Sequence, residues 1–129
     1  MSHLLPNLLA IAAGGALGAL GRYGVMNLVG ALAGRVFPWG TLAVNLLGSL
    51  LLGALFVLVV QNEAVRREWE SVLTVGFLGA FTTFSTFSLE TMVMLQTGRV
   101  LTAAAYVGTS VVVCVAAAGL GMRLARLLI

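Results

Sequence analysis

The sequence predicts an all-α membrane protein in which residues 1–129 form a single domain of four transmembrane helices, the third of them broken. Of its residues, 60% are hydrophobic and only 9% are charged, with a mean hydropathy of +1.10. A soluble domain of this size needs far more charge to cover its surface. The apolar residues also fall into four stretches. Each is long enough to cross roughly 30 Å of hydrocarbon with about 20 helical residues.

We expect the four helices at residues 5–32, 38–60, 71–95 and 100–127. Pro6 and Pro38 suit the first turns of the first two, where the N–H that proline lacks would have no partner. Residues 34–37 and 96–99 are tight connections, and the charged stretch 61–70 is a solvated loop. These boundaries leave no room for a second domain.

The first helix carries a small surface and one buried charge. Gly14 and Gly18 form a Gly-x-x-x-Gly pair, which lets helices approach closely in lipid. Arg22 lies past the middle of the span, where a guanidinium costs about 2.5–3.5 kcal/mol on insertion scales. It either reaches out to the headgroups or attracts anions at the mouth of a water-filled vestibule.

The second helix has a polar stripe, because Thr41, Asn45 and Ser49 recur every four residues. Asn45 offers two donors and one acceptor. Polar side chains in membranes often hold helices together, so Asn45 serves either that purpose or the binding of a ligand.

The third helix contains the most informative stretch, residues 76–90, with two glycines, four phenylalanines, one carboxylate and five hydroxyl side chains: Thr82, Thr83, Ser85, Thr86 and Ser88. Hydrocarbon cannot satisfy such groups, so this stretch must face protein or a water-filled path. We expect the helix to break between Gly76 and Thr83. The hydroxyls can cap freed backbone groups, and freed carbonyls can coordinate a cation such as Na⁺.

Phe84 and Phe87 lie three residues apart on one face of this helix. Such pairs are usually plain packing, but the edge of a phenyl ring is positive. Two edges can therefore stabilise a small anion without a hydrogen bond. Glu90 is the only acid in any span, and it caps, pairs at the interface or lines a pore.

The fourth helix has a polar track of residues that recur every four positions: Thr102, Tyr106, Ser110 and Cys114. Their hydroxyls either bond back to their own helix or line a path. Four helices of this length pack solidly. A conducting path is therefore expected between two copies, which predicts a homo-oligomer.

Four spans place both termini on one side of the membrane. Arg66, Arg67, Arg123 and Arg126 gather there, against Arg35 and Arg99 on the other side. This difference of two arginines is a weak orientation signal, compatible with insertion both ways. The arginines form no run or basic face, which argues against nucleic acid as a partner.

These features together resemble the Fluc (CrcB) fluoride channel family over nearly the whole chain. The motifs are Gly21-Arg22, the stretch Gly40-Thr-Leu-Ala-Val-Asn-Leu-Leu-Gly48, and Gly76-Phe-Leu-Gly79 followed by Thr82-Thr-Phe-Ser-Thr-Phe-Ser88 and Glu90. The third motif is very specific. Two positions depart from the family pattern: Ala80 replaces a usual glycine at the break, and Cys114 replaces a common hydroxyl.

The resemblance implies a passive, fluoride-selective channel in the inner (plasma) membrane, an antiparallel dual-topology homodimer with two pores along its interface. It implies a structural Na⁺ held by the carbonyls of Gly79 and Thr82. Phe84 and Phe87 would face fluoride, Asn45 would donate to it, and Arg22 would stand at the vestibule. Thr41, Tyr106 and Ser110 would line the path. The roles of Thr83, Ser85, Ser88 and Glu90 stay open.

Other classes of function fit the residues less well. A proton-coupled drug exporter needs a carboxylate in the first span, which holds Arg22 and no acid. Proton-coupled fluoride exchange would have only Glu90 as a relay. An intramembrane hydrolase is excluded, because no base accompanies any serine or Cys114, and we expect no enzyme activity. A non-transporting scaffold subunit remains an alternative.

Overall fold

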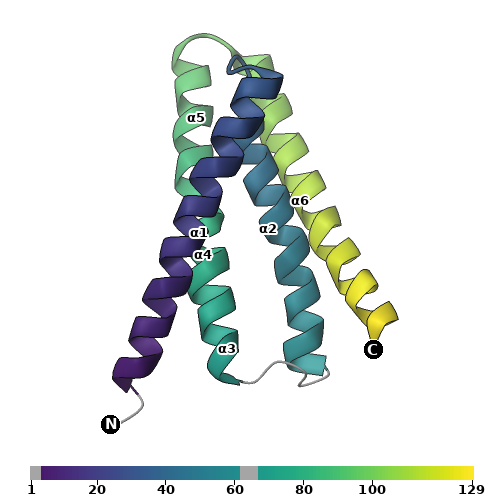
Figure 1. Ribbon diagram of the computed structural model, residues 1–129. Helices are drawn as coiled ribbons and strands as arrows, with labels where there is room; N and C mark the ends of the chain where they lie inside the picture. The colour runs from purple at the N-terminus through teal and green to yellow at the C-terminus, as the bar shows by residue number, and fades with distance from the viewer. Residues whose placement is uncertain (1–3, 62–66) are drawn as a thin grey trace.

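The computed structural model describes residues 4–61 and 67–129, and every regular element in these ranges is helical (Figure 1). Four stretches are long and apolar enough to cross a membrane: Leu4–Ala33, Trp39–Val59, Trp69–Gln96 and Val100–Leu128. They match the predicted spans to within two residues at each end. The all-α fold with four spans is therefore confirmed.

Two glycine turns connect the spans at one end of the molecule. Helix α1 (Leu4–Ala33) is followed by Gly34, which has a φ of +82°, and α2 (Trp39–Phe56) follows Pro38. Gly98, with a φ of +76°, closes the turn before α6 (Val100–Leu128). Positive φ favours glycine, so both connections are sharp. Helix η1 (Val57–Gln61) extends α2 toward the other end, where Glu63 and Arg66 of the predicted loop lie outside the described residues.

The third span is assembled from four short pieces: α3 (Arg67–Ser71), η2 (Val72–Leu78), α4 (Gly79–Phe81) and α5 (Phe84–Gln96). Helix η2 is a π-helix, in which hydrogen bonds span five residues, as from the Gly79 N–H to the Thr74 carbonyl.

The predicted break in this span is confirmed at Thr82 and Thr83, which are extended with ψ angles of 159° and 109°. Gly79 keeps helical angles. The chain therefore opens at two β-branched residues, which favour extended backbone, at the C-terminal edge of the predicted interval.

Glycines set the contact between α1 and the third span. A Cβ on Gly14 would lie 2.7 Å from the Val72 carbonyl oxygen, and one on Gly18 would collide with the Phe77 carbonyl. The close packing predicted for the Gly14–Gly18 surface is thereby confirmed.

Glycines also set the contact between α2 and α6. A Cβ on Gly53 would meet the Ala118 carbonyl, and one on Gly121 would meet the Leu50 carbonyl. The two backbones thus pack directly against each other, which fixes how the polar faces of α2 and α6 meet the third span.

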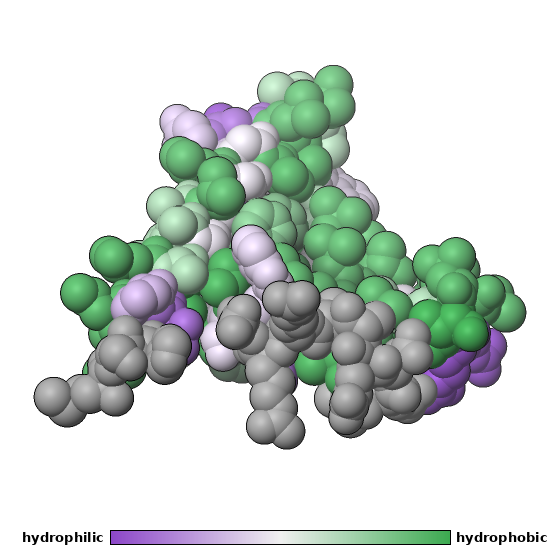
Figure 2. All heavy atoms as spheres, turned by 60° about the horizontal axis from the view of Figure 1, so that its bottom comes forward, coloured by the Kyte–Doolittle hydropathy of each residue, from purple (hydrophilic) through white to green (hydrophobic). Residues whose placement is uncertain are grey.

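Both chain termini lie at the same end of the helices (Figure 1). Arg123 and Arg126 are near that end, whereas Arg35 and Arg99 lie in the connections at the opposite end. Hydrophobic side chains cover much of the surface, and hydrophilic ones gather toward the ends (Figure 2). Helix α1 buries only Gly14 and Gly18 of its thirty residues. This leaves a broad apolar surface for lipid or another protein.

Candidate functional site

The break in the third span is held by one side chain of α2. Asn45 Nδ2 donates to the Thr83 carbonyl at 3.0 Å, and the Thr83 N–H donates to Asn45 Oδ1 at 2.8 Å. Thr83 is buried, so its backbone groups need these partners. The structural role considered for Asn45 is therefore present, and its amide keeps one further N–H for another acceptor.

The break also diverts the donors of two backbone carbonyls. In a continuous helix the N–H groups of Thr83 and Thr86 would bond to the carbonyls of Gly79 and Thr82. Here the Thr83 N–H goes to Asn45, and the Thr86 N–H goes to Thr83 Oγ1 at 3.2 Å. The carbonyls of Gly79 and Thr82 thus lose their usual helical partners.

Hydroxyl side chains around the break mostly bond locally. Thr83 Oγ1 caps α5 and donates to Thr86 Oγ1 at 2.8 Å. Thr82 Oγ1 donates to the Leu78 carbonyl, and Ser88 Oγ donates to the Phe84 carbonyl. Ser85 lies 3.5 Å from Thr83 Oγ1 and is exposed. Of these hydroxyls, Thr83 Oγ1 caps a backbone N–H that the break frees, that of Thr86, whereas Thr82 and Ser88 bond back to carbonyls of their own helices.

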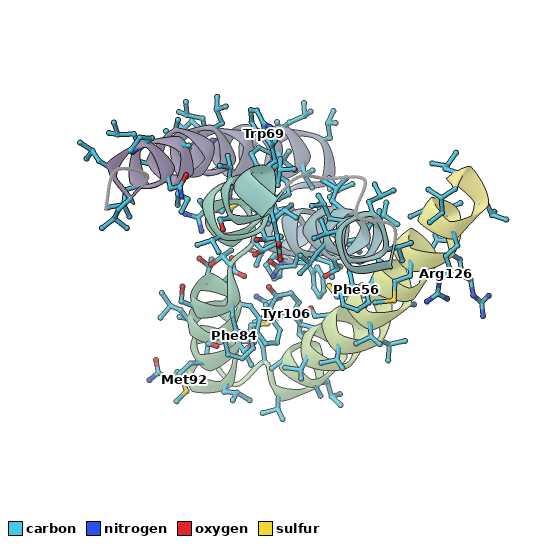
Figure 3. All side chains as sticks on the ribbon, turned by 90° about the horizontal axis from the view of Figure 1, so that it is seen from below. Phe56, Trp69, Phe84, Met92, Tyr106 and Arg126 are labelled. Carbon is cyan, nitrogen blue, oxygen red and sulfur yellow. The ribbon has the colours of Figure 1, made fainter. Side chains whose placement is uncertain are left out.

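Phe84 and Phe87 lie together at the start of α5, with ring centroids 5.6 Å apart and planes inclined by 44°. Phe84 is 79% exposed, whereas Phe87 packs against Tyr106 of α6 at 5.1 Å. Seen from below, Phe84 and Tyr106 lie in the space between α5 and α6 (Figure 3). Phe87 therefore packs against the core of the chain, whereas the Phe84 ring lies on its surface.

A groove of about 380 Å³ runs beside these rings, between α2, the third span and α6. Its wall includes both rings, the amide of Asn45 and three residues of the break, Gly79, Thr82 and Thr83. We call it the phenylalanine groove.

Two residues of the fourth-helix track, Ser110 and Cys114, also line the phenylalanine groove. Ser110 is buried, and its Oγ has no hydrogen-bond partner among the described residues. A buried hydroxyl without a partner is costly.

Glu90 is hydrogen-bonded through both carboxylate oxygens. Thr41 donates to Oε1 at 2.8 Å, and Tyr106 donates to Oε2 at 2.7 Å. Both donors are almost fully buried, at 1% and 0% exposure. Glu90 of α5 thus connects Thr41 of α2 to Tyr106 of α6 through its carboxylate.

Arg22 stands apart from the other predicted residues. It is half-buried on α1, and it lines neither the phenylalanine groove nor the cavity at the end of the molecule that carries Arg35.

Sequence reasoning missed two features of this region. Phe37, in the first connection, packs edge-on against Tyr106 with centroids 5.4 Å apart and planes at 83°. Arg35 and Arg99, counted only for orientation, line one cavity together. No spacing pattern announces contacts between residues so distant in the chain.

The comparisons with known proteins cover most of the chain. A family model described as "CrcB-like protein, Camphor Resistance (CrcB)" matches residues 9–122. A protein of Hahella chejuensis named fluoride-specific ion channel FluC is 50% identical over 125 residues, covering 97% of this chain and 98% of that protein.

Similar proteins of two other bacteria carry the same name. The one from Magnetococcus marinus is 51% identical over 118 residues, covering 92% of this chain and 96% of its own length. The one from Coxiella burnetii is 45% identical over 121 residues, covering 93% and 98%. With four candidate spans and a family match over most of its length, this chain is a multi-pass membrane protein that belongs to the CrcB-like family.

Proposed function

We propose that this protein is a fluoride-selective channel of the inner membrane, which exports cytoplasmic fluoride passively through two pores at a homodimer interface. The observation that carries the proposal is the phenylalanine groove, where two aromatic rings adjoin a buried hydroxyl without a partner. The names of the relatives, at 45–51% identity, support fluoride as the ion. No chemical reaction is involved.

The groove offers a small anion replacements for its water. The edges of the Phe84 and Phe87 rings carry the positive part of the ring quadrupole. The Ser110 hydroxyl and the remaining Asn45 N–H are hydrogen-bond donors. Thr41 and Tyr106 lie beyond, engaged with Glu90, and continue the path. Several weak sites in series let an ion enter and leave again. Arg22, farther away, raises the local anion concentration through its long-range field.

A second copy is needed because a single chain leaves the groove open. Phe84 is 79% exposed beside the groove. A partner laid across this face would bury the ring and close the path. The weak arginine bias supports an antiparallel partner, since it permits insertion in both orientations.

A structural Na⁺ fits the residues at the break. The carbonyls of Gly79 and Thr82, whose helical donors are diverted, are the hard oxygen ligands that such a cation takes. Within the described ranges no three His, Cys, Asp or Glu side chains group together. Bound there, Na⁺ would supply a fixed positive charge near the dimer axis.

The proposal is tested in cells that lack their own fluoride exporter. Expression of this chain should restore growth in fluoride medium, and a Phe84→Ile variant of equal abundance should restore it only at lower fluoride concentrations. If the variant restored growth equally well, the groove would not be the fluoride path. If the wild-type chain did not restore growth, fluoride would not be the ion that the protein exports.

A further inference from the structure

We infer that Arg35 and Arg99 build a second anion-attracting vestibule, at the end of the molecule opposite the termini, which delivers small hydrated anions toward the phenylalanine groove. The inference rests on the proposed function, because a vestibule has a purpose only if the groove conducts.

The vestibule is a cavity of about 460 Å³ where the α1–α2 and α5–α6 connections come together (Figure 1). Arg35, Arg99 and the amide of Asn27 are in its wall. Thr41 and Glu90 also line it, and Thr41 is only 1% exposed, so these two form its inner end. The cavity thus leads from charged groups at the surface to the buried Thr41 and the carboxylate of Glu90.

Both guanidinium groups are available to an anion. Arg99 Nη2 donates to the Val36 carbonyl at 3.0 Å, which uses one of its five N–H donors and holds the group beside the cavity. Arg35 folds back over the end of α1, with its Nε 3.5 Å from where a Cβ of Gly30 would be. In the ranges 4–61 and 67–129, neither arginine forms an ion pair with a carboxylate.

The only carboxylate in the lining does not cancel this charge. Both oxygens of Glu90 accept hydrogen bonds from Thr41 and Tyr106, at 2.8 and 2.7 Å. With two arginines and one carboxylate in its lining, the cavity carries a net positive charge. A concave surface of one sign focuses its field and raises the local concentration of counter-ions.

A series of side-chain contacts through Tyr106 connects the vestibule to the phenylalanine groove. Glu90, at the inner end of the vestibule, is bonded to Tyr106, and the Tyr106 ring contacts Phe87 at 5.1 Å. Phe87 in turn lines the groove. The inner end of the vestibule is therefore connected to the wall of the groove through Tyr106.

The test is the initial rate of fluoride efflux from phosphatidylcholine vesicles that contain the full-length chain. Rates are compared at low and high ionic strength, set with sodium gluconate, because the screening length falls from roughly 30 Å at 0.01 M to 3 Å at 1 M. The variants are Arg35→Gln, Arg99→Gln and the double change. Arg99→Lys keeps the charge but not the planar fork.

Arg123→Gln is the matched control. It removes the same charge from an exposed position near the other end of α6, outside both cavities. Size-exclusion chromatography checks that each variant keeps the oligomeric state of the wild type.

At low ionic strength and low fluoride, the double variant should lose about threefold to tenfold in rate. The loss should vanish at high ionic strength, while Arg99→Lys and Arg123→Gln stay near wild type. A double variant that matches the wild type at low ionic strength would overturn the inference. So would an equal loss at both ionic strengths, since that points to damage rather than to charge.

Lipid phosphates are the other anions that the two arginines can meet. If the arginines bind lipid phosphates instead, adding anionic lipid to the vesicles will change the efflux rate of the variants differently from that of the wild type. The dependence of efflux on fluoride concentration will then be the same in the variants and the wild type. That result would refute the vestibule. If the wild type itself releases no fluoride, the proposed function fails. If the wild type conducts and the variants behave like it, only the vestibule fails.

Discussion

The side chain of Asn45 and the backbone of Thr83 hydrogen-bond to each other in both directions, at 3.0 and 2.8 Å. The two residues belong to different spans, so this pair fastens α2 to the break in the third span. It also takes the N–H that would otherwise close the helix onto Gly79. One amide thereby holds the break open and frees a carbonyl.

Replacing Asn45 with leucine should destabilise the protein by about 2–4 kcal/mol, because it leaves a buried N–H and a buried carbonyl of Thr83 without partners. The free energy of unfolding in detergent measures the loss. Asn27→Leu is the matched control, since the Asn27 amide bonds only to Tyr23 of its own helix. Equal losses for the two variants would show that the Asn45–Thr83 pair does not hold the break.

Two glycines of α6 should respond in opposite directions to alanine. Gly121→Ala forces a Cβ into the Leu50 carbonyl and should cost about 1–3 kcal/mol. Gly119 has nothing within 4 Å of its Cβ position, so Gly119→Ala should stabilise by about 0.5–1 kcal/mol through helix propensity. Thermal unfolding in detergent compares them, and a stable Gly121→Ala variant would contradict the α2–α6 contact.

Phe84→Ile should slow fluoride efflux from vesicles severalfold, because isoleucine has no ring edge to present to the ion. The protein should stay folded, because the ring is 79% exposed within one chain and isoleucine keeps an apolar side chain for the contact with a partner. Phe87→Ile should also slow efflux, and it should cost about 1 kcal/mol through the lost ring contact with Tyr106. Phe56→Ile, on α2 and outside both cavities, is the control. Normal efflux in both groove variants would mean that the rings are only packing.

Preparation without Na⁺ should weaken the protein if Gly79 and Thr82 hold the ion. A ligand that binds only the folded state stabilises it by mass action. Purification in choline chloride should therefore lower the unfolding midpoint and the dimer fraction, and return of Na⁺ should restore both. Protein prepared with and without Na⁺ that unfolds at one temperature would refute the cation site.

The fold could be predicted from the sequence because each span carries its own signal. Apolar length gave the spans, and the threonines near Gly79 indicated a break in the third. The site could be predicted only in part. That Glu90 bonds to both Thr41 and Tyr106 depends on three helices meeting, and no spacing within one helix encodes that meeting. The shared cavity of Arg35 and Arg99 depends likewise on two connections folding together.

Anion selectivity in purified vesicles tests the central claim most directly. Vesicles loaded with equal fluoride and chloride are followed with two ion-selective electrodes after the electrical potential is released. We expect rapid fluoride release, with a chloride trace no faster than that of protein-free vesicles. Release of chloride as fast as fluoride, or no release above the protein-free level, would contradict a fluoride path beside Phe84 and Phe87.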